Sequence, residues 1–158
     1  FEAFPNENGV FMERFTVEET QRPAMPTPPD VNPAQIERAL TKYIAEKLNL
    51  TVDKDIFRGG LPLGIDGCGV ELTEEELSNS VGLRTINAEV KCRDVNRDHV
   101  FKTIYALADA FPAYGKTVIV NGEEITFMAI MKKDVRLATE IDSGRIKTMG
   151  RIELRLKV

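Results

Sequence analysis

Twelve of the last 14 residues of the chain alternate between mainly apolar and charged side chains, and this pattern constrains the fold more than any other feature. The apolar set is even-numbered and the charged set is odd-numbered: Ile146, Thr148, Ile152, Leu154, Leu156 and Val158 against Arg145, Lys147, Arg151, Glu153, Arg155 and Lys157. Successive side chains of a strand point to opposite faces of a sheet. The pattern therefore predicts a long strand with one face on a core and the other face in water.

Further strands are expected in the middle of the chain. Residues 83–93 alternate in the same way, with Ile86, Ala88, Val90 and Cys92 on the covered face and Thr85, Asn87, Glu89, Lys91 and Arg93 on the wet face. Short strands are expected at 56–58 and 68–72, followed by a polar connection over 73–82. Asn121-Gly122 between two apolar runs predicts a β-hairpin, because this dipeptide favours a type I′ turn. Residues 132–144 are expected to form a charged loop or a short helix.

Two amphipathic helices complete the pattern. Asn32 followed by Pro33 is typical of a helix start, and apolar residues continue at helical spacing to Leu48. Asn96 is expected to cap a second helix that Pro112 ends. The order predicts an α+β fold of two layers. It would have a mainly antiparallel or mixed sheet of five to six strands, with two helices on one face, plus an extended N-terminal arm.

The N-terminal segment differs from the rest of the chain in composition. Six of the eight prolines and a net charge of −4 fall within residues 1–33, so residues 34–158 are neutral overall. We interpret 1–33 as an acidic, proline-rich arm and 34–158 as one folded domain. The apolar residues of the arm would dock either on its own domain or on a neighbouring subunit; the candidates are Phe11, Met12, Phe15 and Val17.

Side chains that could support catalysis are scarce. His99 is the only histidine, and it lies in the first turn of a predicted helix, where a positive charge is unfavourable. Cys68 and Cys92 are too few for a zinc site or a disulfide framework and are expected to be reduced and structural. Gly115-Lys116-Thr117 lacks the first glycine of a phosphate-binding loop. The sequence therefore predicts a chain that is not an enzyme and has no cofactor or metal.

The charged face of the last strand is the strongest candidate for a functional surface. Five bases there (Arg145, Lys147, Arg151, Arg155 and Lys157) accompany one acid, Glu153. The face could be a solvated surface, the lining of a ring, or a docking face for acidic residues of an adjacent copy. The other interface candidates are Glu74, Glu75, Glu76, Lys132, Lys133 and Arg136. A neutral domain argues against general nucleic-acid binding, and no apolar run is long enough to span a membrane.

Four short motifs carry a resemblance to a known family. They are IFRGGLP at 56–62, DGCGVEL at 66–72, INAEVKCRD at 86–94 and NRDHVFKTIYAL at 96–107. In this order they resemble the minor capsid and tail-terminator (tail-completion) proteins of long-tailed bacteriophages. The arm at 1–33 is not part of that pattern.

The resemblance implies a structural virion protein that is assembled in the host cytoplasm and located in the tail or neck. It would form a ring, usually of six copies, that ends the tail tube and joins it to the head-tail connector. DNA could pass through the lumen of the ring without sequence-specific contacts. Two alternatives stay open: another neck or head-completion protein, and a small-molecule-binding or enzymatic domain that uses the loop from Gly59 to Gly69.

Overall fold

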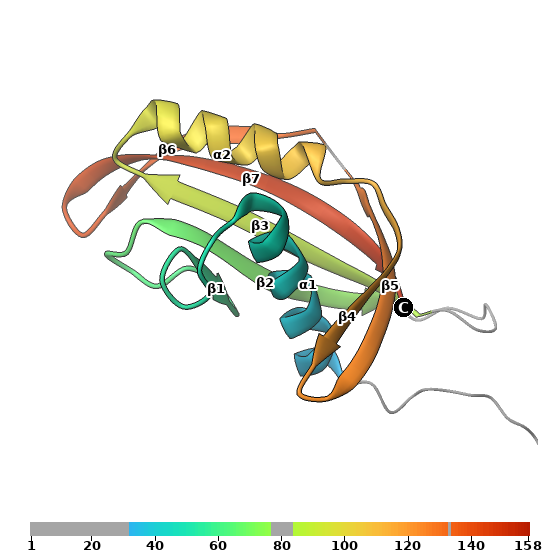
Figure 1. Ribbon diagram of the computed structural model, residues 1–158. Coiled ribbons are helices and arrows are strands. Elements are labelled where there is room, and N and C mark those ends of the chain that lie inside the picture. Colours follow the sequence, from blue (N-terminus) through green and yellow to red (C-terminus); the bar gives the residue numbers. More distant parts are fainter. Residues whose placement is uncertain (1–31, 77–83, 133) are drawn as a thin grey trace, which may run out of the picture. The chain divides into compact units, whose positions relative to one another are not determined.

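The structure, a computed structural model, describes residues 32–76, 84–132 and 134–158. Phe11, Met12, Phe15, Val17 and Lys133 lie outside these ranges. The elements are α1 (Pro33–Leu48), β1 (Ile56–Arg58), β2 (Gly67–Glu76), β3 (Thr85–Asp94), α2 (Arg97–Asp109), β4 (Ala113–Val120), β5 (Glu123–Met131), β6 (Arg136–Asp142) and β7 (Arg145–Lys157). Figure 1 shows their arrangement.

All seven of these strands belong to one sheet, in the order β1-β2-β3-β7-β5-β4, with β6 also paired to β7. β1 and β2 are parallel, and the other pairs are antiparallel. The α+β class and the mixed sheet are therefore confirmed, with seven strands in place of the five to six expected.

β7 is the strand around which the sheet is built, as the long alternating pattern predicted. One edge of β7 pairs with β3 over residues 148–157. The other edge is shared, because β6 pairs with residues 145–151 and β5 with residues 154–157. A strand of 13 residues is long enough to hold two different neighbours on one edge.

Both helices begin where the sequence predicted, and α1 ends there too, at Leu48, whereas α2 ends at Asp109, three residues before Pro112. The Asn32 side chain accepts a hydrogen bond from the backbone N–H of Gln35 (3.1 Å), and the Asn96 side chain accepts one from that of His99 (3.1 Å). These bonds satisfy backbone donors that the first turn of a helix leaves unpaired. α1 is capped by Asn49, which follows Leu48 and adopts the left-handed conformation (φ 57°) typical of a helix C-terminus.

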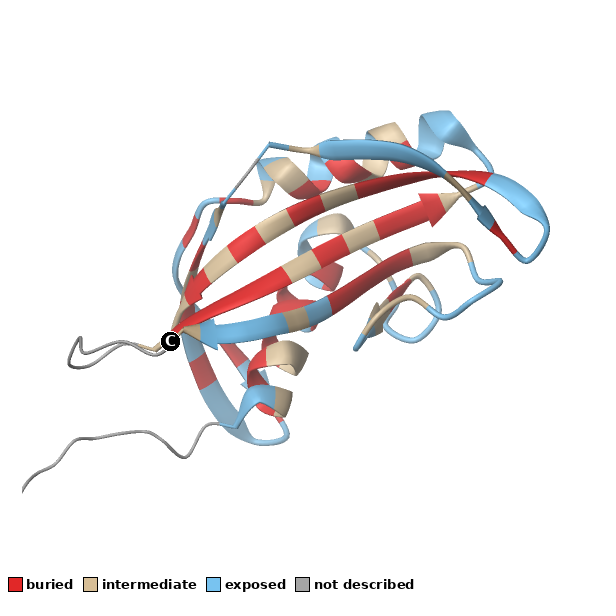
Figure 2. Cartoon of the chain, turned by 180° about the vertical axis from the view of Figure 1, so that it is seen from behind, coloured by how far each residue is buried: buried red, intermediate tan, exposed pale blue. Residues whose placement is uncertain are grey.

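The core lies between the helices and the sheet. Tyr43 of α1 contacts Phe127 of β5 edge-on and Phe111 at a tilt, with ring centroids 5.6 and 5.8 Å apart, and its hydroxyl donates to the carbonyl of Ala110 (2.9 Å). α2 packs closely on β7 at Gly150, where an added Cβ would lie 3.1 Å from a carbon of Ile104. Figure 2 shows buried residues alternating along β3 and β7.

Residues 132–144 are not a loop or a short helix, and this expectation was wrong. They contain β6, which forms a hairpin with β7 through Ser143-Gly144. Both turn residues have positive φ (52° and 80°), as a type I′ turn requires. Ile146 belongs to the apolar row of β7 but is exposed, because it lies beside this turn.

The expected wet face of β3 is partly buried. Thr85, Asn87 and Arg93 are all buried, because long side chains of neighbouring strands cover them. Lys157 of β7 donates a hydrogen bond to Thr85, and Asn87 donates one to Glu76 of β2 (3.1 Å). A central strand between two charged neighbours is therefore less exposed than its own sequence predicts.

The two cysteines form a disulfide bond, which corrects the expectation of reduced thiols. Cys68 of β2 and Cys92 of β3 are directly opposite in the antiparallel register, and both are buried. The pairing of β2 with β3 brings the two sulfurs together. The bond links β2 to β3, the strands on either side of the polar connection predicted at 73–82. Residues 73–76 of that connection belong to β2 instead, and 77–82 lie outside the described residues.

Candidate protein-interaction surface

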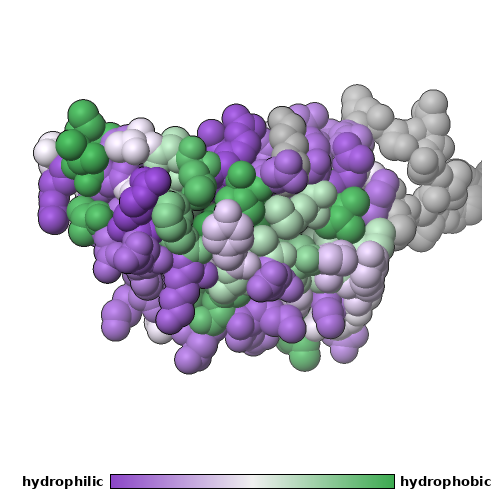
Figure 3. All heavy atoms as spheres, turned by 90° about the horizontal axis from the view of Figure 1, so that it is seen from above, coloured by the Kyte–Doolittle hydropathy of each residue, from purple (hydrophilic) through white to green (hydrophobic). Residues whose placement is uncertain are grey.

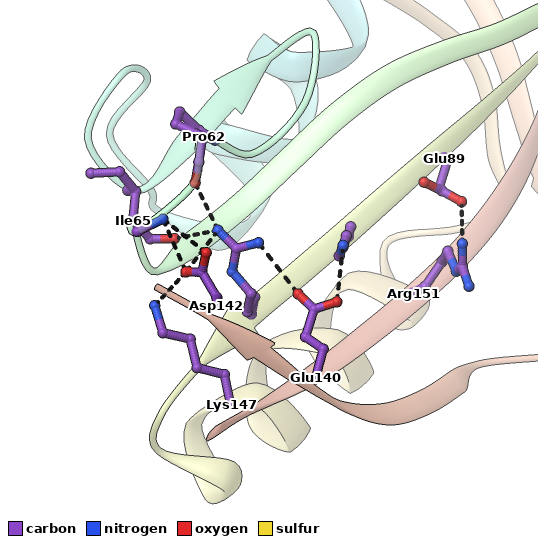
Figure 4. A network of polar contacts seen from close by, with 10 residues as sticks. Pro62, Ile65, Glu89, Glu140, Asp142, Lys147 and Arg151 are labelled. Carbon is purple, nitrogen blue, oxygen red and sulfur yellow. Dashed lines mark hydrogen bonds and ion pairs between the residues drawn. The ribbon is translucent and has the colours of Figure 1, made fainter. Parts of the chain in front are cut away.

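A buried ion network lies at the base of the β6–β7 hairpin. The Asp142 side chain is 1% exposed and the Lys147 side chain 3% exposed, and Lys147 Nζ lies 2.7 Å from Asp142 Oδ2. Lys147 Nζ is also 2.6 Å from Oδ1 of Asp66, which lies just before β2. Figure 4 shows Lys147 and Asp142 pointing toward each other. A buried charge is stable only when it is paired, so these three residues depend on one another.

Arg93 of β3 extends the network to the loop that connects β1 and β2. One guanidinium nitrogen donates to the carbonyls of Pro62 (2.7 Å) and Ile65 (3.0 Å) and lies 3.4 Å from Asp142 Oδ2. The backbone N–H of Gly64 donates to both oxygens of Asp142 (3.0 Å each). The loop and the hairpin are therefore attached to each other and to β3 through one buried carboxylate (Figure 4).

The network changes the acidity of its own members. The hydrogen bond from Lys147, followed by the one from the Gly64 N–H, lowers the pKa of Asp142 below its usual value. The carboxylates of Asp142 and Asp66 in turn raise the pKa of Lys147. Both groups are therefore charged over the whole neutral range, and the network is intact there.

A group of exposed apolar residues borders this network along the chain, in the loop before β2 and in the β6–β7 hairpin. We call it the hairpin-end patch and define it by five exposed residues: Leu63, Ile65, Leu137, Ile141 and Ile146. Leu63 is 85%, Ile141 75% and Ile146 71% exposed, and the two isoleucines are opposite each other in the hairpin. Figure 3 shows hydrophobic side chains gathered at the left end of the molecule, where the hairpin lies in Figure 1. Exposed apolar clusters on a fixed support are typical of protein contact sites.

The charged face of β7 is not a basic strip, because acids of neighbouring strands pair with most of its bases. Arg151 contacts Glu89 of β3 (2.9 Å), Arg155 contacts Glu76 of β2 (3.4 Å), and Lys147 is buried in the network. Arg145 lies exposed beside the hairpin turn. The sequence missed these pairs because strand order and register decide which acids lie beside β7.

The three glutamates proposed to meet an adjacent copy lie at the end of β2, and two of them have partners within the same chain. Glu75 forms two hydrogen bonds with the Arg84 side chain (2.7 and 2.8 Å), which lowers the pKa of Glu75. Glu76 contacts Arg155, and Glu74 is exposed. The glutamates that were expected to pair with bases of an adjacent copy therefore pair largely with bases of their own chain.

The remaining interface candidates of the described residues, Lys132 and Arg136, lie at the edge of β7 that pairs with β5 and β6. Lys132 is exposed, and its backbone N–H donates to the carbonyl of Glu153 (2.8 Å). Arg136 of β6 lies 3.5 Å from the Glu153 carboxylate. Both residues lie beside the edge of β7 that β5 and β6 occupy. Glu74 to Glu76 belong to β2, which lies beyond β3 on the opposite edge of β7.

Shallow hollows border the glycine-rich loop. One of about 410 Å³ is lined by Gly59, Gly60, Leu61, Pro62, Gly69, Glu71, Glu89 and Lys91. The loop lies so close to β2 that an added Cβ on Gly69 would come 2.4 Å from the backbone nitrogen of Leu61. In the described part of the chain, no group of three or more His, Cys, Asp or Glu side chains is placed to hold a metal ion.

Comparisons with known proteins identify no family. No protein-family model matches the chain, and no curated protein matches it. None of the helices in the described ranges is long and apolar enough to cross a membrane.

The sequence pointed to this surface only in part. It singled out Lys147 and Arg136, but not Arg93, Asp142 or the apolar patch. One signal was present, since Ser143-Gly144 between alternating segments is a hairpin sequence of the same kind as Asn121-Gly122.

Proposed function

We propose that the chain is a structural protein of a bacteriophage virion that acts through contacts with other protein chains. In this proposal it forms a ring, of six copies in the family it resembles, that ends the tail tube and joins it to the head-tail connector. The chain would be located in the tail or neck of the virion.

The hairpin-end patch is the observation that carries this proposal. Leu63, Ile141 and Ile146 expose apolar surface to water, and each directly precedes a residue of the buried ion network, Gly64, Asp142 or Lys147, which fixes the backbone there. Ordering a flexible surface on binding costs free energy, and a surface that is already ordered avoids much of that cost. The patch therefore suits contact with the apolar surface of a neighbouring copy or of the tail tube.

The resemblance of four motifs supports the same proposal. The motif at 56–62 contains Pro62, and the motif at 86–94 contains Arg93, whose guanidinium binds the carbonyl of Pro62. Two of the motifs thus meet at the support of the hairpin-end patch. Residues of the motifs that carry the resemblance therefore lie next to the candidate contact surface.

The tail tube of the virus that encodes the chain provides the direct test. Purified tail-tube protein would be polymerised with the gold-labelled chain and examined by electron microscopy. We expect label at one end of each tube and tubes that stop growing. Absence of the label from tube ends would contradict the proposal, and binding to the connector alone would favour another neck protein.

A pair of substitutions tests whether the hairpin-end patch makes the contact. Ile141→Asp with Ile146→Asp places two charges on the exposed apolar pair, and we expect at least a tenfold loss of tube-end binding. Because both residues are exposed, the melting temperature should stay close to that of the wild type. Ile119→Asp, at another exposed isoleucine in β4, is the matched control and should bind normally. Equal binding by the double variant would remove the patch from the proposed contact.

The hollow beside the glycine-rich loop supports a second candidate function, the binding of a small molecule. Its volume of about 410 Å³ is within the range of small-ligand sites, and Glu71, Glu89 and Lys91 supply polar groups. A thermal-shift screen with metabolite mixtures is the test, because a ligand of the folded state raises the melting temperature. A reproducible rise, together with no binding to tube ends, would favour this function over the first.

A further inference from the structure

The outer edge of β6 has backbone groups that nothing else in the described chain pairs with. β6 pairs with β7 alone among the described strands. Asp142 and Arg145 flank the two-residue turn, and in such a hairpin this pair is hydrogen-bonded, with bonded and non-bonded pairs alternating from there. The N–H and C=O groups of Leu137, Thr139 and Ile141 therefore point away from β7, along the free edge.

The two strands at the ends of the sheet order, β1 and β4, are poorly suited to pairing with another chain. β1 has only three residues. In β4 the outward carbonyl of Ile119 accepts a hydrogen bond from Lys42 Nζ (2.7 Å), and the register is interrupted between Ala113 and Lys116. Short length, lysines and irregular register are the usual means of blocking an edge strand. β6 has seven residues with no proline and no register shift, so its edge is open to pairing.

The sequence of β6 is complementary to itself in the antiparallel direction. When two copies are aligned about Thr139, Leu137 lies opposite Ile141 on one face, twice. A parallel alignment would instead place the exposed Arg136 beside Arg136, where like charges repel. The antiparallel alignment brings together the backbone groups that point outward in both copies. Apolar contact and hydrogen bonding thus favour this antiparallel register.

We propose that two copies of the chain pair through the free edges of β6, antiparallel and about a two-fold axis at Thr139. The contact uses the same surface on both copies, so it closes at a dimer. It goes beyond the proposed function, because a ring needs a head-to-tail contact between different surfaces. An edge of seven residues buries less area than a standard stable interface, so the dimer is weak and depends on concentration.

A cysteine on the proposed axis tests the register directly. In a hydrogen-bonded antiparallel pair, opposite Cα atoms are about 5.5 Å apart, which suits a disulfide. Under mild oxidation, the full chain with Thr139→Cys should form a covalent dimer of about 35 kDa, twice the 17.7 kDa chain, on a non-reducing gel. Thr117→Cys, exposed in β4, is the matched control and should stay a single chain. If Thr139→Cys cross-links no more than this control, the proposal is wrong.

Two further variants test the hydrogen bonds of the edge without a cross-link. Thr139→Pro removes an outward N–H that β7 does not use, so it should abolish the dimer in sedimentation equilibrium and leave the monomer folded. Thr139→Lys places two like charges opposite each other and should weaken the dimer at least tenfold, so it covers the case in which the proline variant does not fold. A dimer that persists in the lysine variant would overturn the proposal. Tube-end binding, measured separately, reports on the proposed function instead.

Discussion

At the scale of residues, the fold depends on one buried carboxylate. Asp142 accepts hydrogen bonds from Lys147 and Gly64 and lies beside Arg93, so it connects three segments that are far apart in the sequence. Its pKa is lowered in the folded protein. A group of this kind stabilises the fold above its unfolded pKa, and the contribution is lost as the pH falls through the folded value.

We expect Asp142→Asn to lower the midpoint of urea unfolding at pH 7, because Lys147 and Arg93 lose their shared counter-charge. The difference from the wild type should shrink as the pH falls below about 4, the unfolded pKa of aspartate, since the carboxylate of the unfolded wild type then binds a proton while that of the folded protein is still ionised. Urea unfolding curves at pH 7, 5, 4 and 3 measure this.

The control for this prediction is Asp134→Asn, at an exposed aspartate in the connection before β6. It should change the midpoint little at any of the four pH values. A deficit of Asp142→Asn that stays constant from pH 7 to pH 3 would mean that the ionised carboxylate does not stabilise the network.

The burial and the pairing of the charged side chains in this network could not be predicted from the sequence. Arg93 and Lys147 occupy odd positions in alternating segments, which favours a solvated side chain. They are buried because Asp66 and Asp142 arrive from a loop and a hairpin turn with matching charge. Which charged side chains lie beside one another depends on the strand order, and local sequence patterns do not specify the strand order.

At the scale of elements, the sequence predicted the features that depend on local signals, namely the helix ends and a tight turn. Asn32, Asn96 and Pro112 mark the helix ends, and Asn121-Gly122 marks the β4–β5 turn, so the expected boundaries agree with the observed ones to within three residues. The sequence did not predict β6, because charged and small residues interrupt the row of apolar side chains that usually marks a strand. The hairpin with β7 supplies its stability instead.

The β6–β7 turn itself can be tested by a single substitution. Gly144 has φ +80° and no atom within 4 Å of an added Cβ, so Gly144→Ala changes backbone conformation alone. We expect a loss of about 1–2 kcal/mol in the free energy of unfolding, the usual cost of a left-handed residue with a Cβ. Ser143→Gly, at φ 52°, relieves strain of the same kind and should not destabilise the protein. Equal stability of Gly144→Ala and the wild type would contradict a left-handed turn here.

At the scale of the whole molecule, charge is organised by sequence region and by strand order. The net charge of −4 lies in residues 1–33, and the folded domain that follows is neutral. Within the domain, Glu89 and Glu76 pair with Arg151 and Arg155 across strands. With these charges compensated, exposed apolar residues and the free edge of β6 are the features left to make contacts.

The account as a whole requires that the chain acts as an assembly. The most direct measurement is the mass of the native particle, by mass photometry of the full chain with and without the tail-tube protein of its virus. A ring of six copies predicts a species of about 106 kDa, six times the 17.7 kDa chain, that is present or enriched when tail-tube protein is added. Particles no larger than the 35 kDa dimer under both conditions would contradict the ring and the function proposed from it.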